Sequence, residues 1–261
     1  MLGRLMKYEW NATWQLLVPA NLLIVVMTIF ATVTVRLDVF DTDNEGIVFS
    51  ALIIMLSYVG SMLVVIIGTA IYLIHRFYTS TYGDQGYLLH TLPVDKHHII
   101  IAKVLVSTAW VMLSFLLMYM SVQILFNEEG DIFTQIIENV KVSAMLWAGA
   151  EDVSVFAIIM TLIAGLSAMF ARTLKITACI SLGQLSNNHK VLSAFGIYFL
   201  IYIVQKIVNG IYYVILGYIN TITADWHYGK SWEYVLITSL IYSVGFYLVT
   251  WYIMEKKLNL D

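Results

Sequence analysis

Histidine is the side chain in this sequence best suited to bind a metal or move a proton, and the chain contains six histidines. His97 and His98 are adjacent, so on a helix their side chains point about 100° apart and do not readily share a metal. His75 and His90 lie in one polar segment, but no set of carboxylates or thiols stands at ligand spacing beside them. The other two are loop residues, His189 and His227. We therefore expect no metal site, and we interpret the first four histidines as residues of a membrane interface.

One short motif resembles a nucleotide-binding sequence. Gly229-Lys230-Ser231 matches the end of a phosphate-binding loop, but Ala224 occupies the position of the first glycine in G-x-x-x-x-G-K-[ST]. The sequence has no H-E-x-x-H zinc motif and no G-x-S-x-G nucleophile motif. Cys179 is the only cysteine, so there is no cysteine cluster for a metal. We expect no catalytic residue and no cofactor in this chain, which is predicted not to be an enzyme.

The composition indicates which elements must carry any function. With 60% hydrophobic and 12% charged residues, the chain is far more apolar than a soluble domain. Six apolar runs exceed the roughly 18 residues that mark a transmembrane helix. They cover residues 16–35, 48–74, 99–126, 153–171, 191–216 and 235–254. The sequence therefore predicts an all-α polytopic membrane protein, with a single transmembrane domain over residues 1–261.

The basic residues predict the orientation of the chain. If the N-terminus lies inside, ten of the 14 Lys and Arg residues fall on the cytoplasmic side, as the positive-inside rule requires. These residues are Arg4, Lys7, Arg76, Lys96, Lys103, Arg172, Lys175, Lys190, Lys256 and Lys257. We expect both termini in the cytoplasm, the lipid bilayer as a partner, and no nucleic acid.

Polar residues inside the spans bear on how transport would be driven. Proton- and sodium-coupled transporters usually place Asp, Glu or His within their spans, and the six apolar cores contain none of these. Apart from Lys103 at the cytoplasmic end of the third span, the one embedded charge is Lys206, which lies near Gln205 and Asn209 in the fifth span. Lys206 is either a lysine that snorkels toward the headgroups or a buried functional residue. The substrate-binding residues stay unknown from the sequence.

Three segments flank the spans. We interpret residues 1–14 as an interfacial helix on the inner leaflet, because their apolar side chains fall close to one helical face; the alternative is a cytoplasmic extension of the first span. Residues 127–152 contain an amphipathic stretch that predicts a second interfacial helix on the outer side. Residues 172–190 either extend the fourth helix into the cytoplasm or bring Arg172 into the membrane, and the cost of a membrane-embedded arginine favours the extension.

The polar segment 75–98 joins the second and third spans. It is too long for a hairpin turn and too amphipathic for a flexible linker. Residues 83–93 at its centre predict a short helix at the membrane surface that ends near Pro93. A helix joined rigidly to two spans can transmit a push from a soluble partner. The alternative is an interfacial loop that only anchors itself.

Several stretches carry a family resemblance. They are Leu5-Met6-Lys7-Tyr8-Glu9-Trp10, Gly86-Tyr87-Leu88-Leu89-His90-Thr91-Leu92-Pro93-Val94, Ile180-Ser181-Leu182-Gly183-Gln184-Leu185 and Asn188-His189-Lys190. Together with six spans, these stretches resemble the permease subunit of a type-2 ABC exporter of Gram-positive bacteria. The resemblance covers nearly the whole chain, and 86–94 is its most specific part.

The resemblance implies a coupling helix after the second span, which docks into a groove of a separate ATPase subunit. The candidate contacts are Asp84, Gln85, Gly86, Tyr87, Leu88, Leu89, His90, Thr91, Leu92 and Pro93. Tyr87, Leu88 and Leu92 would form the apolar docking surface, and Gln85 stands where family members often have an acidic residue. ATP and magnesium would bind in the partner ATPase.

The resemblance also implies a second permease chain, either a copy of this one or a sister permease, in the bacterial cell membrane. The expected cargo is hydrophobic or amphipathic, such as an antimicrobial peptide, a toxin or a lipid-like molecule. Two other classes stay open. One is a membrane scaffold or sensor whose cytoplasmic loop binds a regulatory protein. The other is a membrane-embedded enzyme, which the missing catalytic motifs disfavour.

Overall fold

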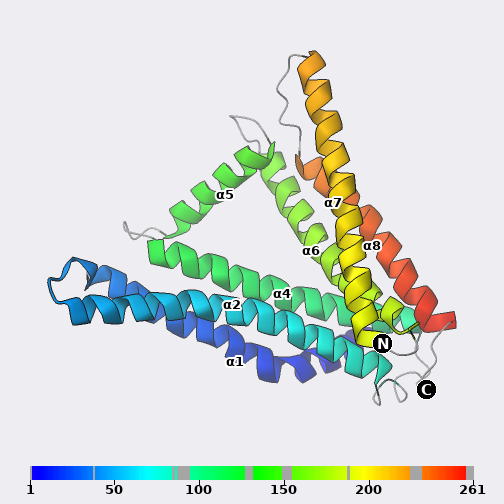
Figure 1. Cartoon of the computed structure of the whole chain (residues 1–261), viewed down its shortest axis with the longest axis horizontal. Coiled ribbons are helices and arrows are strands. Elements are labelled where there is room, and N and C mark those ends of the chain that lie inside the picture. The colour runs from blue at the N-terminus through cyan, green and yellow to red at the C-terminus, as the bar shows by residue number, and fades with distance from the viewer. Residues whose placement is uncertain are drawn as a thin grey trace. The chain divides into compact units, whose positions relative to one another are not determined.

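The structure is a computed structural model that describes residues 2–37, 39–83, 86, 95–126, 132–148, 155–186, 189–223 and 231–256. These residues form α-helices and one short 3-10 helix, with no strand among them (Figure 1). The α-helices are α1 (Leu2–Arg36), α2 (Glu45–Tyr82), α4 (Lys96–Phe126), α5 (Ile132–Ala148), α6 (Val155–Gly183), α7 (Lys190–Thr223) and α8 (Ser231–Lys256). The 3-10 helix is η1 (Val39–Asp41).

Six of these helices are long and apolar enough to cross a membrane, namely α1, α2, α4, α6, α7 and α8. A helix pairs its backbone N–H and C=O groups internally, which a segment in hydrocarbon must do. The described parts of all six expected spans lie within these helices. The chain is an all-α multi-pass membrane protein, as the sequence predicts.

The helices are longer than the expected spans, which shortens the polar segment between α2 and α4. Residues 75–82 belong to α2 and residues 96–98 belong to α4. The 38 residues of α2 are about 57 Å long, against about 30 Å of hydrocarbon, so even a strong tilt leaves part of the helix outside the membrane. The connection between the two helices is therefore residues 83–95.

The flanking segments are also helical. Residues 2–14 continue into the first span without a break, which corresponds to the extension and not to a separate interfacial helix. Residues 172–183 likewise continue α6, and a turn follows at 184–185. The amphipathic stretch expected within 127–152 forms α5. For residues 2–14 and 172–183, one continuous helix leaves fewer backbone groups without intrahelical partners than two separate helices would.

The chain forms two compact units, which are residues 1–76 with 105–138 and residues 77–104 with 139–261. In the first unit, three apolar layers join α1, α2 and α4. The buried residues of the layers are Leu17, Leu73, Val106 and Trp110; then Ile24, Val65 and Met118; then Ala31, Tyr58 and Leu125. The α1 residues recur every seven positions, which is the spacing of helices that pack along a shared seam.

In the second unit, α6 packs against both α7 and α8. α7 and α8 lie beside each other, because the Tyr212 and Tyr234 rings stack with centroids 3.7 Å apart (Figure 1). The most apolar 18-residue stretch of α7 contains no buried residue. Its apolar side chains are therefore free to contact lipid.

Candidate functional site

The predicted docking segment, 84–93, lies almost wholly outside the described residues. Gly86 alone is described, and it is buried. Its N–H donates a 2.7 Å hydrogen bond to the Gly83 carbonyl oxygen. A Cβ atom at Gly86 would lie 2.4 Å from the Thr81 carbonyl oxygen, so the tight turn after α2 excludes any side chain there. The other nine candidate contacts stay predictions.

The structure does show how the α2 end of this segment is held. The Tyr82 hydroxyl donates a 2.6 Å hydrogen bond to Ser181 Oγ on α6. Ser181 Oγ in turn donates to the Thr177 carbonyl oxygen at 2.8 Å. Ser181 is fully buried, and a hydrogen bond to a buried hydroxyl group is costly to lose. The last turn of α2 is thereby fixed to α6.

A second contact joins the end of α2 to the beginning of α4. Lys103 Nζ on α4 donates a 2.6 Å hydrogen bond to Ser80 Oγ on α2, and both residues are buried. The lysine lies about two turns after the start of α4. The two helices that flank the segment are therefore held to each other as well.

The α4 end of the segment is held by α8. Lys96 Nζ donates a 2.9 Å hydrogen bond to the Met254 carbonyl oxygen, near the C-terminus of α8, where a cation also interacts well with the helix dipole. The His97 ring stacks on Trp251, with centroids 5.2 Å apart, and shares a hydrogen bond with the Tyr247 hydroxyl. His97 thus has a packing role in the structure.

These contacts make residues 83–95 a short connection between two anchored helix ends. One end is fastened to α6 through Tyr82, and the other to α8 through Lys96 and His97. A displacement of the connection must therefore move α6 and α8, or break these hydrogen bonds. The arrangement is suited to mechanical transmission.

The other described histidines show no ligand arrangement. His98 Nδ1 lies 3.7 Å from the Asp95 carboxylate, and His189 is exposed. No group of three or more His, Cys, Asp or Glu side chains that could hold a metal occurs in the part of the chain that the structure describes. His90 and His227 lie outside that part, as does the Gly229-Lys230-Ser231 motif.

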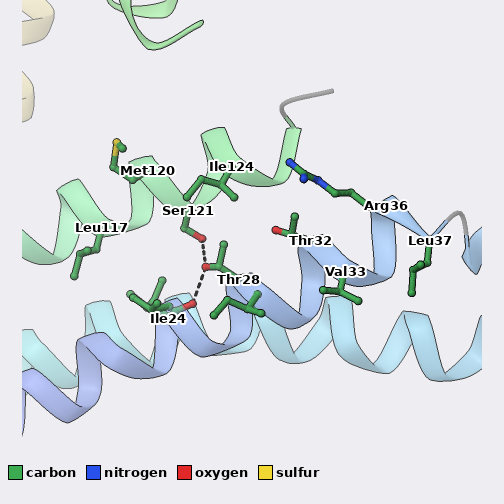
Figure 2. A pocket seen from close by; sticks show the side chains of 12 residues that line it. Ile24, Thr28, Thr32, Val33, Arg36, Leu37, Leu117, Met120, Ser121 and Ile124 are labelled. Carbon is green, nitrogen blue, oxygen red and sulfur yellow. Dashed lines mark hydrogen bonds between the residues drawn. The ribbon is translucent and has the colours of Figure 1, made fainter. Parts of the chain in front are cut away.

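An apolar cavity of about 400 Å³ lies between α1 and α4 in the first unit (Figure 2). Its floor is polar: Thr28 Oγ1 lies 2.6 Å from Ser121 Oγ, which lies 2.8 Å from the Tyr58 hydroxyl on α2. Figure 2 shows Thr32 and Arg36 at one end of the cavity, near the last turns of α1 and α4. A cavity with apolar walls and a cation at one end is suited to an amphipathic molecule.

Two clusters of charged side chains could not be found from the sequence. Arg76 Nε lies 3.5 Å from Glu9 Oε2, which ties the start of α1 to α2 in the first unit.

In the second unit, Lys206 does not stand alone: it lines a cavity of about 300 Å³ together with Arg172 and Lys175 of α6. The i, i+3 spacing of Arg172 and Lys175 was a signal that they share a helix face.

Comparisons with protein-family models, with curated proteins and with solved structures found no match to this chain.

Proposed function

We propose that this chain is the membrane-spanning subunit of an ATP-driven exporter for hydrophobic or amphipathic molecules. A separate ATPase subunit would bind residues 84–93 and supply the energy, with ATP and magnesium bound in that partner and no hydrolysis in this chain. The proposal places the protein in the bacterial cell membrane with both termini in the cytoplasm. A second permease chain, identical or related, would complete the transport unit.

The anchoring of both ends of residues 83–95 is the observation that carries the proposal. A loop that only rests on the membrane needs no such fastening. Here Tyr82 holds one end to α6, and Lys96 holds the other end to α8. When ATP closes the ATPase subunits, the displaced segment would pull on two membrane-spanning helices at once. α4 is also continuous from Lys96 to Phe126, and Ser121 of the same helix lines the apolar cavity.

The apolar cavity supports the expected class of cargo. Its lining is mainly aliphatic, with Thr28, Thr32 and Ser121 as small polar groups and Arg36 as the one cation. An apolar chain would bury its surface against α1 and α4, while a polar head would meet Arg36. This cavity is the substrate site that we propose.

The proposal is tested by recovering the partner. The tagged chain should be purified from membranes of its native host in mild detergent, and the bound proteins identified by mass spectrometry. We expect a nucleotide-binding subunit, and we expect vanadate-sensitive ATP hydrolysis from the complex but not from this chain alone. Recovery without any nucleotide-binding protein would contradict the exporter and favour a scaffold or sensor.

A matched pair of variants locates the docking site. Leu88→Asp places a charge in the predicted apolar docking surface and should abolish recovery of the ATPase while the chain still inserts. Phe40→Asp makes the same change at an exposed aromatic residue before the other end of α2 and should leave recovery unchanged. Equal recovery with both variants would show that the docking site lies elsewhere.

A further inference from the structure

The second unit contains a cavity in which cations accumulate without acidic partners. The cavity, about 300 Å³, lies among α6, α7 and α8. Arg172 and Lys175 of α6 and Lys206 of α7 line it; Lys175 is buried, whereas Arg172 and Lys206 are exposed. No carboxylate is among its lining residues, and none of these three cations forms an ion pair with a described carboxylate. Three positive charges that line one cavity among membrane-spanning helices repel one another, and an anion would relieve this repulsion.

The partners that these cations do have are neutral. Lys175 is only 8% exposed, and its Nζ donates a 3.1 Å hydrogen bond to Gln205 Oε1. The same ammonium group lies 4.6 Å from the centre of the Tyr198 ring. An ammonium group has three N–H donors, so the bond to Gln205 leaves two for a ligand. Lys206 Nζ lies 5.5 Å from the centre of the Tyr202 ring.

The neutral polar groups of the cavity add further donors. Tyr234 on α8 donates a hydrogen bond to Asn209 Oδ1 on α7, which leaves the Asn209 NH₂ group as a donor. Gln205 likewise accepts from Lys175 through its oxygen and retains its own NH₂ group. Donors therefore outnumber acceptors in the cavity, as a phosphate with its several acceptor oxygens requires.

The surroundings of the cavity are apolar. Ile203 and Ile207 flank Lys206 on the exposed side of α7, where they are 42% and 56% exposed. Acyl chains would cover such a surface, whereas a soluble anion would not. Basic pockets between transmembrane helices are recognised sites for phosphate-bearing lipid headgroups.

We propose that the cavity formed by Arg172, Lys175 and Lys206 binds the phosphate of an anionic lipid, with the acyl chains against α7. The phosphate would accept hydrogen bonds from the guanidinium group and from both ammonium groups. This inference does not depend on the exporter proposal, because it requires neither an ATPase partner nor the cavity between α1 and α4.

Native mass spectrometry of the purified chain in neutral detergent tests the inference. Phosphatidylglycerol supplies a lipid-borne phosphate, inorganic phosphate a soluble one, and diacylglycerol the same acyl chains without phosphate. We expect the wild-type chain to bind phosphatidylglycerol well above diacylglycerol. Each of Arg172→Gln and Lys206→Gln should weaken this binding about tenfold, which is the loss of one hydrogen bond to a charged group.

Two controls keep the test specific. Lys141→Gln removes an exposed lysine of α5 and should leave binding unchanged. Lys206→Arg retains the charge and should also retain binding, and thermal unfolding should show that every variant is folded. If Arg172→Gln and Lys206→Gln weaken the binding of inorganic phosphate by the same factor, the result would support a phosphate site that takes its ligand from solution. Equal binding of phosphatidylglycerol and diacylglycerol, or no effect of Arg172→Gln and Lys206→Gln, would overturn the inference.

Discussion

The Tyr82 hydroxyl lies 2.6 Å from Ser181 Oγ, and this hydrogen bond fastens the last turn of α2 to α6. It lies immediately before the segment that we propose as the ATPase docking site. A movement of that segment therefore acts on α6 through Tyr82, the last residue of α2. The transmission hypothesis therefore depends on one specific hydrogen bond, which a single substitution can remove.

Tyr82→Phe should leave the ATPase bound but lower the coupling of ATP hydrolysis to transport. The free energy of unfolding should fall by about 1 kcal/mol, because Ser181 loses its donor inside the protein. The double variant Tyr82→Phe/Ser181→Ala should be less destabilised than the sum of the single variants. Tyr78→Phe is the control, since the Tyr78 hydroxyl makes no hydrogen bond to any described residue. If the changes in the free energy of unfolding at Tyr82 and Ser181 are additive, the two side chains are not energetically coupled.

Gly86→Ala should prevent assembly with the ATPase. The new Cβ atom would lie 2.4 Å from the Thr81 carbonyl oxygen, so the turn that starts the docking segment must open. Gly60→Ala on α2 is the matched control, because a Cβ atom there meets nothing within 4 Å. That control should be neutral or stabilising, by at most about 1 kcal/mol. Co-purification of the ATPase measures both, and retained assembly in Gly86→Ala would contradict the expected turn.

Ile124→Trp should close the apolar cavity between α1 and α4. A dansyl-labelled fatty acid, whose carboxylate suits Arg36, serves as the probe for binding by fluorescence. We expect its Kd to rise about tenfold, which corresponds to about 1.4 kcal/mol of lost binding energy. Ile71→Trp enlarges an exposed residue of α2 and should leave the Kd unchanged. An unchanged Kd in both variants would remove the cavity as the substrate site.

Removing one partner of the Glu9–Arg76 ion pair should destabilise the chain. The two side chains are 10% and 19% exposed, so a single charge would remain poorly solvated. We expect Arg76→Met to lower the free energy of unfolding by roughly 2 kcal/mol, and the Glu9→Met/Arg76→Met double variant to recover part of the loss. Unfolding in a mixed-detergent titration gives these values. A double variant no more stable than Arg76→Met would show that the pair is not energetically coupled.

The six spans could be predicted from the sequence because their signal is local. A run of about 20 apolar residues has few alternatives to a membrane helix. The length of α2 was underestimated, because residues 75–82 are polar enough to end a hydropathy window but still form helix. The continuation of α6 through residues 172–183 was expected, because an arginine inside the membrane is costly. Helix length outside the bilayer depends on packing, and a hydropathy window does not detect packing.

The contacts between helices could not be predicted from the sequence. Tyr82 and Ser181 are 99 residues apart, and nothing local indicates that they meet. The sequence indicates Lys206 as a charge within a span and Arg172 as a residue just beyond one, but their shared cavity depends on how α6 and α7 are placed in register. The docking segment 84–93 rests on the sequence, while its anchored ends come from the structure.

Photo-crosslinking from position 88 tests the central claim most directly. A benzophenone side chain should replace Leu88 in one variant and Phe40 in another, and both should be irradiated in native membranes with and without ATP. We predict that position 88 crosslinks to a nucleotide-binding subunit with an ATP-dependent yield, and that position 40 does not. No crosslink to such a subunit from position 88, or equal crosslinking from both positions, would contradict the claim that this segment receives the energy of ATP.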